Sequence, residues 1–293
     1  DYVETHSQES SFGNDAWAIL SDIEQKIKVK VESAGVPLKK WDVEIFRGVL
    51  TGCNDAFIIT SEKRNEILAN CIDDTERERT AELIRPILRG RDIYKYGYNW
   101  DNLWLINTHN GIKERLERIH IEDYPSIKQH LDFYINEINS RTDKGDTPYN
   151  LRNCAYMDEF SKPKIIYPNM TKFMPFVYDT SGMVTNQKCF IITGKHLGYL
   201  TAFFNSSLFK FCFANRFPEL QGKTRELSKI FMDDIPILMI DEQNEHIIDS
   251  LIQDIQIEYS EDKAKRIDKF IFDLYHLSLE EQAYIGFIDY GEK

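Results

Sequence analysis

The residues best suited to chemistry are two arginines on either side of a glycine, Arg89-Gly90-Arg91. Glycine permits a tight or left-handed turn of the backbone. Two guanidinium groups that spread from such a turn suit the recognition of phosphate or of guanine. A solvated surface turn would have the same sequence, so both interpretations stay open for this stretch alone.

A second stretch with recognition chemistry covers residues 141–157, which read RTDKGDTPYNLRNCAYM. Arg and Lys contact phosphates, Asn reads base edges, and Tyr stacks on bases. Loops often carry function, although a plain surface loop has this composition too. The candidate residues here are Arg141, Lys144, Asn150, Arg152 and Asn153.

The distribution of charge is more informative than its sum. The 293 residues carry a net charge of −12, which argues against a non-specific binder of polyanions. Residues 81–229, however, hold 21 basic and 16 acidic side chains, whereas residues 1–80 hold 10 and 16 and residues 230–293 hold 5 and 16. A basic middle between acidic flanks favours a localised anion-binding face, and solvated helices would give the same blocks.

Several classes of protein do not fit the composition. An apolar content of 42% predicts a globular core, and no apolar run reaches the roughly 18 residues that span a bilayer. The acidic N-terminus does not resemble a secretory signal. The five cysteines are scattered, so we expect no disulfide or zinc site and a reducing, cytoplasmic setting.

Catalytic motifs are also missing from the sequence. It has no phosphate-binding or dinucleotide-binding glycine motif, no nucleophile elbow and no H-E-x-x-H. It lacks the Asp/Asn-Pro-Pro-Tyr/Phe tetrapeptide that would hold a flipped adenine. We therefore expect a binding domain with no catalytic residue, no metal ligand and no cofactor of its own.

Apolar periodicity predicts an α+β fold, in which a mixed sheet or meander is flanked by helices. Asp241 and Ser278 are expected caps in a C-terminal helical hairpin. The expected helices cover 14–33, 61–81, 111–140 (a pair broken near Pro125), 195–217 (broken at 205–207), 241–260 and 261–285. The expected strands lie within 41–60, 103–107, 163–193 (a meander with a hairpin turn at 179–182) and 235–237.

Six segments, taken in order, resemble a known family. They are RGVLTGCNDAFII (47–59), IRPILRGRDIYKY (84–96), KPKIIYPNM (162–170), LTAFFNSSLFKF (200–211), DDIPI (233–237) and RIDKFIFDLYHLSLEEQAYI (266–285). Together they resemble the TaqI-like C-terminal specificity domain. That domain ends gamma-class adenine-N6 DNA methyltransferases and fused type IIG restriction-modification enzymes of the Eco57I kind.

The resemblance implies a target-recognition domain for double-stranded DNA. Its partner would be an N-terminal methyltransferase domain that uses S-adenosylmethionine, so residues 1–40 are expected to be a helical linker, 41–240 the recognition domain and 241–293 a helical hairpin. No membrane contact is expected. The predicted DNA-binding residues are the five of the 141–157 loop together with Arg89, Gly90, Arg91, Lys95, Lys162, Lys164, Lys188, Asn205 and Lys223. The alternative is a scaffold domain that docks a protein partner through its acidic C-terminal helices.

Overall fold

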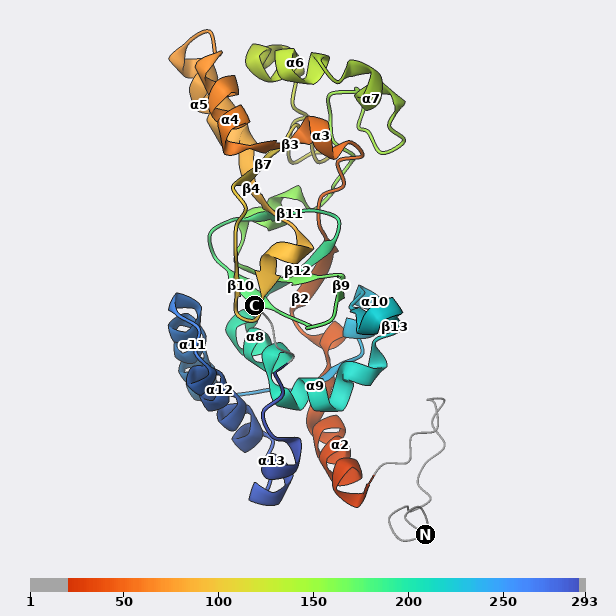
Figure 1. Cartoon of the computed structure of the whole chain (residues 1–293), viewed down its shortest axis with the longest axis vertical. Helices are drawn as coiled ribbons and strands as arrows, with labels where there is room; N and C mark the ends of the chain where they lie inside the picture. The colour runs from red at the N-terminus through yellow and green to blue at the C-terminus, as the bar shows by residue number, and fades with distance from the viewer. Residues whose placement is uncertain (1–20, 290–293) are drawn as a thin grey trace.

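A four-stranded antiparallel sheet lies at the centre of the computed structural model, which describes residues 21–289 (Figure 1). Its strand order is β10-β8-β12-β2, with bounds β2 Val43–Arg47, β8 Lys164–Pro168, β10 Val177–Asp179 and β12 Cys189–Gly194. Ile191 pairs with Ile166 on one side and with Phe46 on the other. Every residue of β8 is buried, because both faces of the sheet are covered.

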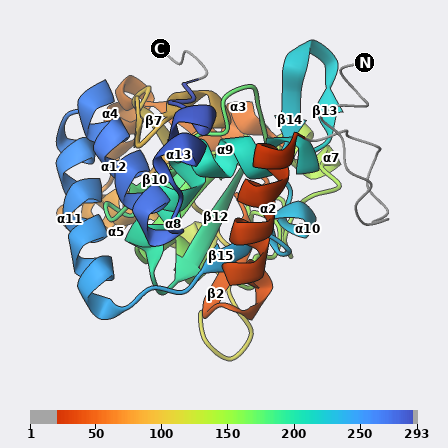
Figure 2. The ribbon, with the colours of Figure 1, turned by 90° about the horizontal axis from the view of Figure 1, so that it is seen from below.

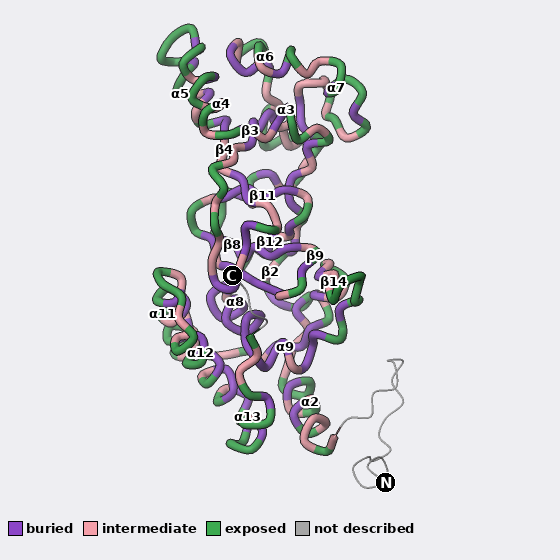
Figure 3. The backbone as a smooth tube through the Cα atoms, viewed as in Figure 1, coloured by how far each residue is buried: buried purple, intermediate pink, exposed green. Residues whose placement is uncertain are grey.

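Successive side chains of a strand point to opposite faces, and here the two faces enter two different cores. Ile165 and Ile192 belong to one hydrophobic cluster, whereas Ile166 and Ile191 belong to the other. The sheet is therefore shared by two lobes of an elongated molecule, and its strands are among the most buried segments of the chain (Figure 3).

The first lobe is helical. Its helices are α2 Asp22–Ala34, α8 Leu197–Asn205, α9 Ser207–Phe213, α11 Glu242–Ile257, α12 Glu261–Leu274 and α13 Leu279–Ile285, and a strand pair of β1 Gly35–Pro37 with β15 Pro236–Leu238 joins them. The expected break at 205–207 is present, since Ser206 caps α9 and accepts a hydrogen bond from Phe209 N at 3.1 Å. Asp241 and Ser278 also act as caps, and the latter forms a capping box with Glu281.

The second lobe contains the sheet β11-β4-β7-β3 and lies at the opposite end of the molecule (Figure 1). Its strands are β3 Ile58–Thr60, β4 Ile84–Leu88, β7 Leu103–Ile106 and β11 Val184–Thr185, where β11 runs parallel to β4. Its helices are α3 Asn54–Phe57, α4 Ser61–Ala69, α5 Asp74–Leu83, α6 Pro125–Asp132 and α7 Ile135–Ser140.

The remaining elements are short. They are the pair β5 Ile93–Tyr94 and β6 Gly97–Tyr98, the sheet of β9 Met170–Thr171, β13 Glu219–Leu220 and β14 Thr224–Glu226, helix α10 Lys229–Met232, and the 3-10 turns η1 Leu38–Lys40, η2 Gly90–Asp92, η3 Ile121–Asp123, η4 Met157–Ser161, η5 Ala214–Arg216 and η6 Gln221–Lys223. The β13–β14 hairpin projects from the body of the molecule (Figure 2).

The α+β class is confirmed, and three local expectations are corrected. The single helix at 61–81 is two helices, α4 and α5. Residues 111–120 form no helix, because Gly111 and Glu114 have positive φ angles of 76° and 65°. The turn at 179–182 closes no hairpin, and the strands of 163–193 are not consecutive neighbours: β10 pairs with β8, whereas β11 pairs with β4.

Side chains from all three expected parts of the chain meet in the first core, for example Ile27, Ile45 and Ile248. Helix α2 is thus packed into this unit, and its role as a linker to a further domain stays a prediction. The expected helix over 14–33 is observed from Asp22 onward, and residues 14–20 lie outside the described part. Within residues 21–289 no helix has the length and apolar character needed to cross a bilayer.

Candidate nucleic-acid interface

Parallel pairing of β4 and β11 brings two polar segments to the same edge of their sheet. The carboxyl ends of parallel strands lie together, so residues 89–91 after β4 lie beside residues 186–188 after β11. Asn186 N donates to Leu88 O at 3.0 Å, which fixes the two segments side by side. The sequence places these residues nearly one hundred positions apart, and only the sheet unites them.

Gly90 lies in close contact with two neighbouring segments. A Cβ atom at this position would lie 3.3 Å from Lys188 O and 3.3 Å from Pro168 Cβ, which is tighter than most real contacts. Gly90 begins the turn η2 and is not among the residues with positive φ, so the tight turn expected here is present in a right-handed form.

Residues 170–173 form the third side of a groove. Asn169 N donates to Lys188 O at 2.8 Å, and Thr171 Oγ1 accepts a hydrogen bond from Phe173 N at 2.9 Å. The groove has a volume of about 660 Å³. Its lining residues are Arg89, Gly90, Arg91, Ile93, Tyr94, Met170, Thr171, Lys172, Phe173, Asn186, Lys188 and Thr224.

The charged side chains that line this basic groove are all positive. Arg91, Lys172 and Lys188 are exposed, and none of them forms an ion pair with another residue of the described chain. No Asp or Glu is among the described residues that line it. Three uncompensated cations beside aromatic and amide side chains form a surface that suits phosphates and bases.

Arg89 lines the same groove but is already paired. Its Nη2 atom lies 2.8 Å from Asp92 Oδ1 and 2.5 Å from Asp101 Oδ2. The hydrogen bond with Asp92 is the main reason that the pKa of Arg89 is raised. Arg89 therefore fixes the shape of the turn, while Arg91 is left to face solvent.

Five residues that were predicted to contact DNA are buried inside the protein, which corrects their assignment to an exposed interface. They are Lys95, Arg141, Asn150, Lys164 and Asn205. Lys164 Nζ lies 2.6 Å from the buried Asp179 Oδ2, and burial lowers the pKa of Lys164. Lys95 lies 4.8 Å from the ring centroid of Phe287. A buried cation with such neighbours is not presented to solvent, so these lysines face the interior of the protein and not a bound duplex.

The other three buried side chains bind backbone groups. Arg141 donates to Pro148 O and to Thr51 O, and its guanidinium lies 4.5 Å from the ring centroid of Phe57. Asn150 Nδ2 donates to Ile119 O at 2.9 Å. Asn205 bonds both the N–H and the carbonyl of Phe176, at 3.1 and 2.7 Å. Each of these side chains holds a loop or a helix end through hydrogen bonds inside the protein.

The remaining predicted residues are exposed but do not line the groove, and their contact with DNA stays a prediction. Lys144 donates to Asn139 O at 2.7 Å, Arg152 pairs with Asp143 at 2.9 Å, and Asn153 accepts a hydrogen bond from Asn110. Lys162 pairs with Glu159 at 2.6 Å. Lys223 lies at the tip of the projecting hairpin, next to Thr224 of the groove.

Eight groove residues were absent from the sequence-based set, and four of them have side chains suited to nucleic acid: Tyr94, Lys172, Phe173 and Asn186. Tyr94 follows the arginine turn, and Lys172 precedes an aromatic residue, which is the interleaving of cations and rings expected of a nucleic-acid surface. The alternation of cations and rings can be read from the sequence. The sequence does not show that residues 186–188 lie beside the arginine turn, because parallel pairing of β11 with β4 has no local signature.

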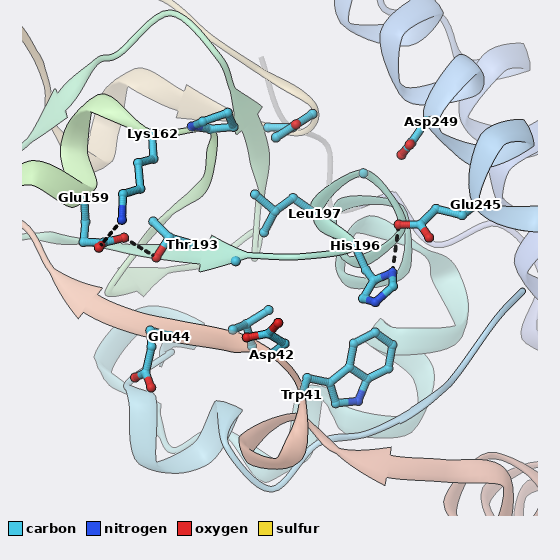
Figure 4. A pocket seen from close by; sticks show the side chains of 15 residues that line it. Trp41, Asp42, Glu44, Glu159, Lys162, Thr193, His196, Leu197, Glu245 and Asp249 are labelled. Carbon is cyan, nitrogen blue, oxygen red and sulfur yellow. Dashed lines mark hydrogen bonds and ion pairs between the residues drawn. The ribbon is translucent and has the colours of Figure 1, made fainter. Parts of the chain in front are cut away.

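A second hollow has the opposite charge (Figure 4). It has a volume of about 540 Å³, and five carboxylates line it: Asp42, Glu44, Glu159, Glu245 and Asp249. Glu245 bonds His196 Nδ1 at 2.8 Å. Among residues 21–289 no three His, Cys, Asp or Glu side chains gather to hold a metal ion. Carboxylates repel phosphates, so anion binding belongs to the basic groove.

The α+β fold carries a groove lined by basic residues, and comparison with known proteins places the chain in a family. A family model described as the TaqI-like C-terminal specificity domain matches residues 85–237, which include every residue that lines the groove. The chain belongs to this family. A search of curated proteins gives no significant match.

Two solved structures have a similar fold. The type IIG restriction endonuclease BpuSI superposes with a TM-score of 0.53 at 13% identity, covering 87% of this chain and 34% of that one. The type IIL restriction-modification enzyme MmeI, solved in complex with DNA, gives a TM-score of 0.60 at 11% identity, covering 85% of this chain and 35% of that one. The chain thus spans about a third of the length of either protein.

Proposed function

We propose that this chain recognises double-stranded DNA as the specificity domain of a restriction-modification enzyme, with the basic groove against the duplex. The observation that carries the proposal is the set Arg91, Lys172 and Lys188, which are exposed, unpaired within the described chain and free of lining carboxylates. The family membership of residues 85–237 supports it. A chain of net charge −12 needs such a local basic surface to approach DNA.

Lysine and arginine in the groove would contact phosphates and set the register of the duplex. Such contacts release counterions, so the logarithm of the affinity falls with the logarithm of the salt concentration by about 0.9 per phosphate contact. Aromatic and amide groups of the same groove, such as Tyr94 and Asn186, lie where bases or sugars would follow the phosphates.

The proposal also includes a catalytic partner domain. A methyltransferase domain in the same parent chain would bind S-adenosylmethionine and receive an adenine flipped out of the duplex held here. The sequence lacks the Asp/Asn-Pro-Pro-Tyr/Phe tetrapeptide that would hold the flipped adenine, so the proposal assigns that role to the partner domain. The residues of this chain bind and orient DNA, and no chemical step is assigned to them.

The test is a titration of fluorescently labelled duplex DNA by anisotropy, at salt concentrations from 50 to 200 mM chosen to span a strong electrostatic effect. We expect Arg91→Ala and Lys188→Ala each to lower the affinity and to reduce the salt slope by about 0.9. The matched control is Lys26→Ala on helix α2, an exposed lysine that does not line the groove. Equal slopes for all three variants, or no binding at the lowest salt, would reject the proposal.

A further inference from the structure

The projecting β13–β14 hairpin is built as a rigid extension of the basic groove. Strand β14 pairs with β9, so that Arg225 lies opposite Thr171 and Glu226 opposite Met170. Thr171 and Met170 line the groove, and so does Thr224 of β14 itself. The hairpin therefore stands directly at the edge of the groove and projects away from the body (Figure 2).

Its base is fastened on both strands. Arg225 donates to Phe217 O at 3.2 Å and to Asn215 Oδ1 at 3.2 Å. Leu227, which follows β14, is fully buried, and its N–H bonds Asn169 O at 2.7 Å. An element fixed in this way can position a side chain at its tip relative to anything bound in the groove.

The tip itself contributes nothing to packing. Residues 219–223 are all exposed, and Leu220 keeps 40% of its surface in solvent. Gly222 and Lys223 have φ angles of 72° and 63°. A left-handed lysine is strained, and strain in a segment that stabilises no core is typical of a functional position. No side-chain hydrogen bond within residues 21–289 engages the amide group of Gln221.

We propose that this hairpin enters the major groove of DNA and that Gln221 reads an adenine there. This inference rests on the proposed function. The major groove admits a two-stranded β-ribbon, and a glutamine amide can make two hydrogen bonds to the N6 and N7 edge of adenine. The apolar Leu220 suits contact with a thymine methyl group, and Lys223 suits a guanine edge or a phosphate. The basic groove holds the backbone, and the hairpin reads the sequence.

The experiment is enrichment of bound duplexes from a randomised library by the full chain, followed by sequencing. Gln221→Ala is compared with Gln243→Ala, an exposed glutamine on α11. We expect Gln221→Ala to lose preference at one base pair, by roughly 5- to 150-fold, while its affinity for random DNA stays within about twofold. Gln221→Glu should change the preference at that position from adenine toward cytosine, whose N4 amino group donates to a carboxylate.

The outcomes separate the inference from the proposed function. If Gln221→Ala enriches the same motif as the unaltered chain while Arg91→Ala still weakens binding, the hairpin is not the reading element and DNA recognition by the groove stands. If the unaltered chain binds DNA without enriching any motif, the inference is rejected. If it binds no DNA, both fail. Unchanged circular dichroism and melting of the two glutamine variants confirm that folding is not the cause.

Discussion

At the scale of single residues, two arginines of one turn have different tasks. Arg89 is held by Asp92 and Asp101, and Asp92 is itself 5% exposed. Arg91 lies two positions further on, is exposed and has no ion-pair partner in the described chain. Arg89 thus holds the turn in shape, and Arg91 extends from the same turn toward solvent, where a ligand can reach it.

These different roles predict that alanine substitution affects stability at Arg89 and DNA binding at Arg91. Arg89→Ala leaves the buried Asp92 carboxylate without its main partner, so it should lower the free energy of unfolding by about 1.5–3 kcal/mol. Arg91→Ala should change stability by less than about 0.5 kcal/mol and weaken DNA binding instead. Urea unfolding beside anisotropy titration measures both. If Arg91→Ala destabilises the fold as much as Arg89→Ala does, the assignment is wrong.

Sequence reasoning found the arginine turn, yet it could not separate buried from exposed cations. Lys162 and Lys164 look alike in the sequence, but Lys164 is fully buried against Asp179 and Lys162 is exposed. Lys164 is the first residue of β8, which is buried throughout, and it pairs with a carboxylate 15 positions away, whereas Lys162 precedes the strand. Composition near a residue carries neither fact.

At the scale of elements, helix caps were predictable from the sequence, whereas helix continuity at 61–81 and 111–120 and the pairing of distant strands were not. The caps Asp241, Ser278 and Ser206 each accept a hydrogen bond from a backbone N–H three residues further on, which a sequence displays directly. The parallel pairing of β11 with β4, which creates the basic groove, depends on strands almost one hundred residues apart. The helical hairpin was therefore predictable, whereas the assembly of the groove was not.

Helices α5 and α6 are joined by one buried carboxylate, and its substitution has a predictable cost. Glu76 accepts hydrogen bonds from Ile72 N at 2.7 Å and from Ser126 N at 2.9 Å. Glu76→Gln directs an amide NH₂ at one of these donors, so we expect a loss of about 1–3 kcal/mol in urea unfolding at pH 7. Glu78→Gln, on the exposed face of the same helix, is the control and should cost less than about 0.5 kcal/mol.

The same carboxylate makes this stability dependent on pH. Burial acts to raise the pKa of Glu76, but the hydrogen bonds from Ile72 and Ser126 outweigh it and lower the pKa below the ordinary value. A lowered pKa in the folded state means that the contribution is complete above about pH 4.3 and is lost as the pH falls further. The difference between Glu76→Gln and the unaltered chain should therefore shrink in that range. A difference that stays constant down to pH 3.5 would contradict this account.

At the scale of the whole molecule, the central sheet couples the two lobes. Apolar runs such as KIIYP in β8 and CFIIT in β12 indicate strands that are covered on both faces, and the structure places a core against each face. The basic groove lies on elements of this junction, since Gly90 contacts the end of β8 and the segment before β12. Its shape thus depends on both cores.

A shared sheet predicts that the lobes unfold together. Ile165 faces the first core and Ile166 the second, and both are fully buried. Truncation of either to Ala should cost about 2–5 kcal/mol. Because each isoleucine belongs to a strand that both cores require, each variant should shift one common transition in differential scanning calorimetry. The exposed Ile230→Ala serves as the control. Two separate transitions, with Ile165→Ala moving one and Ile166→Ala the other, would show that the lobes are independent and that the groove is a contact between domains.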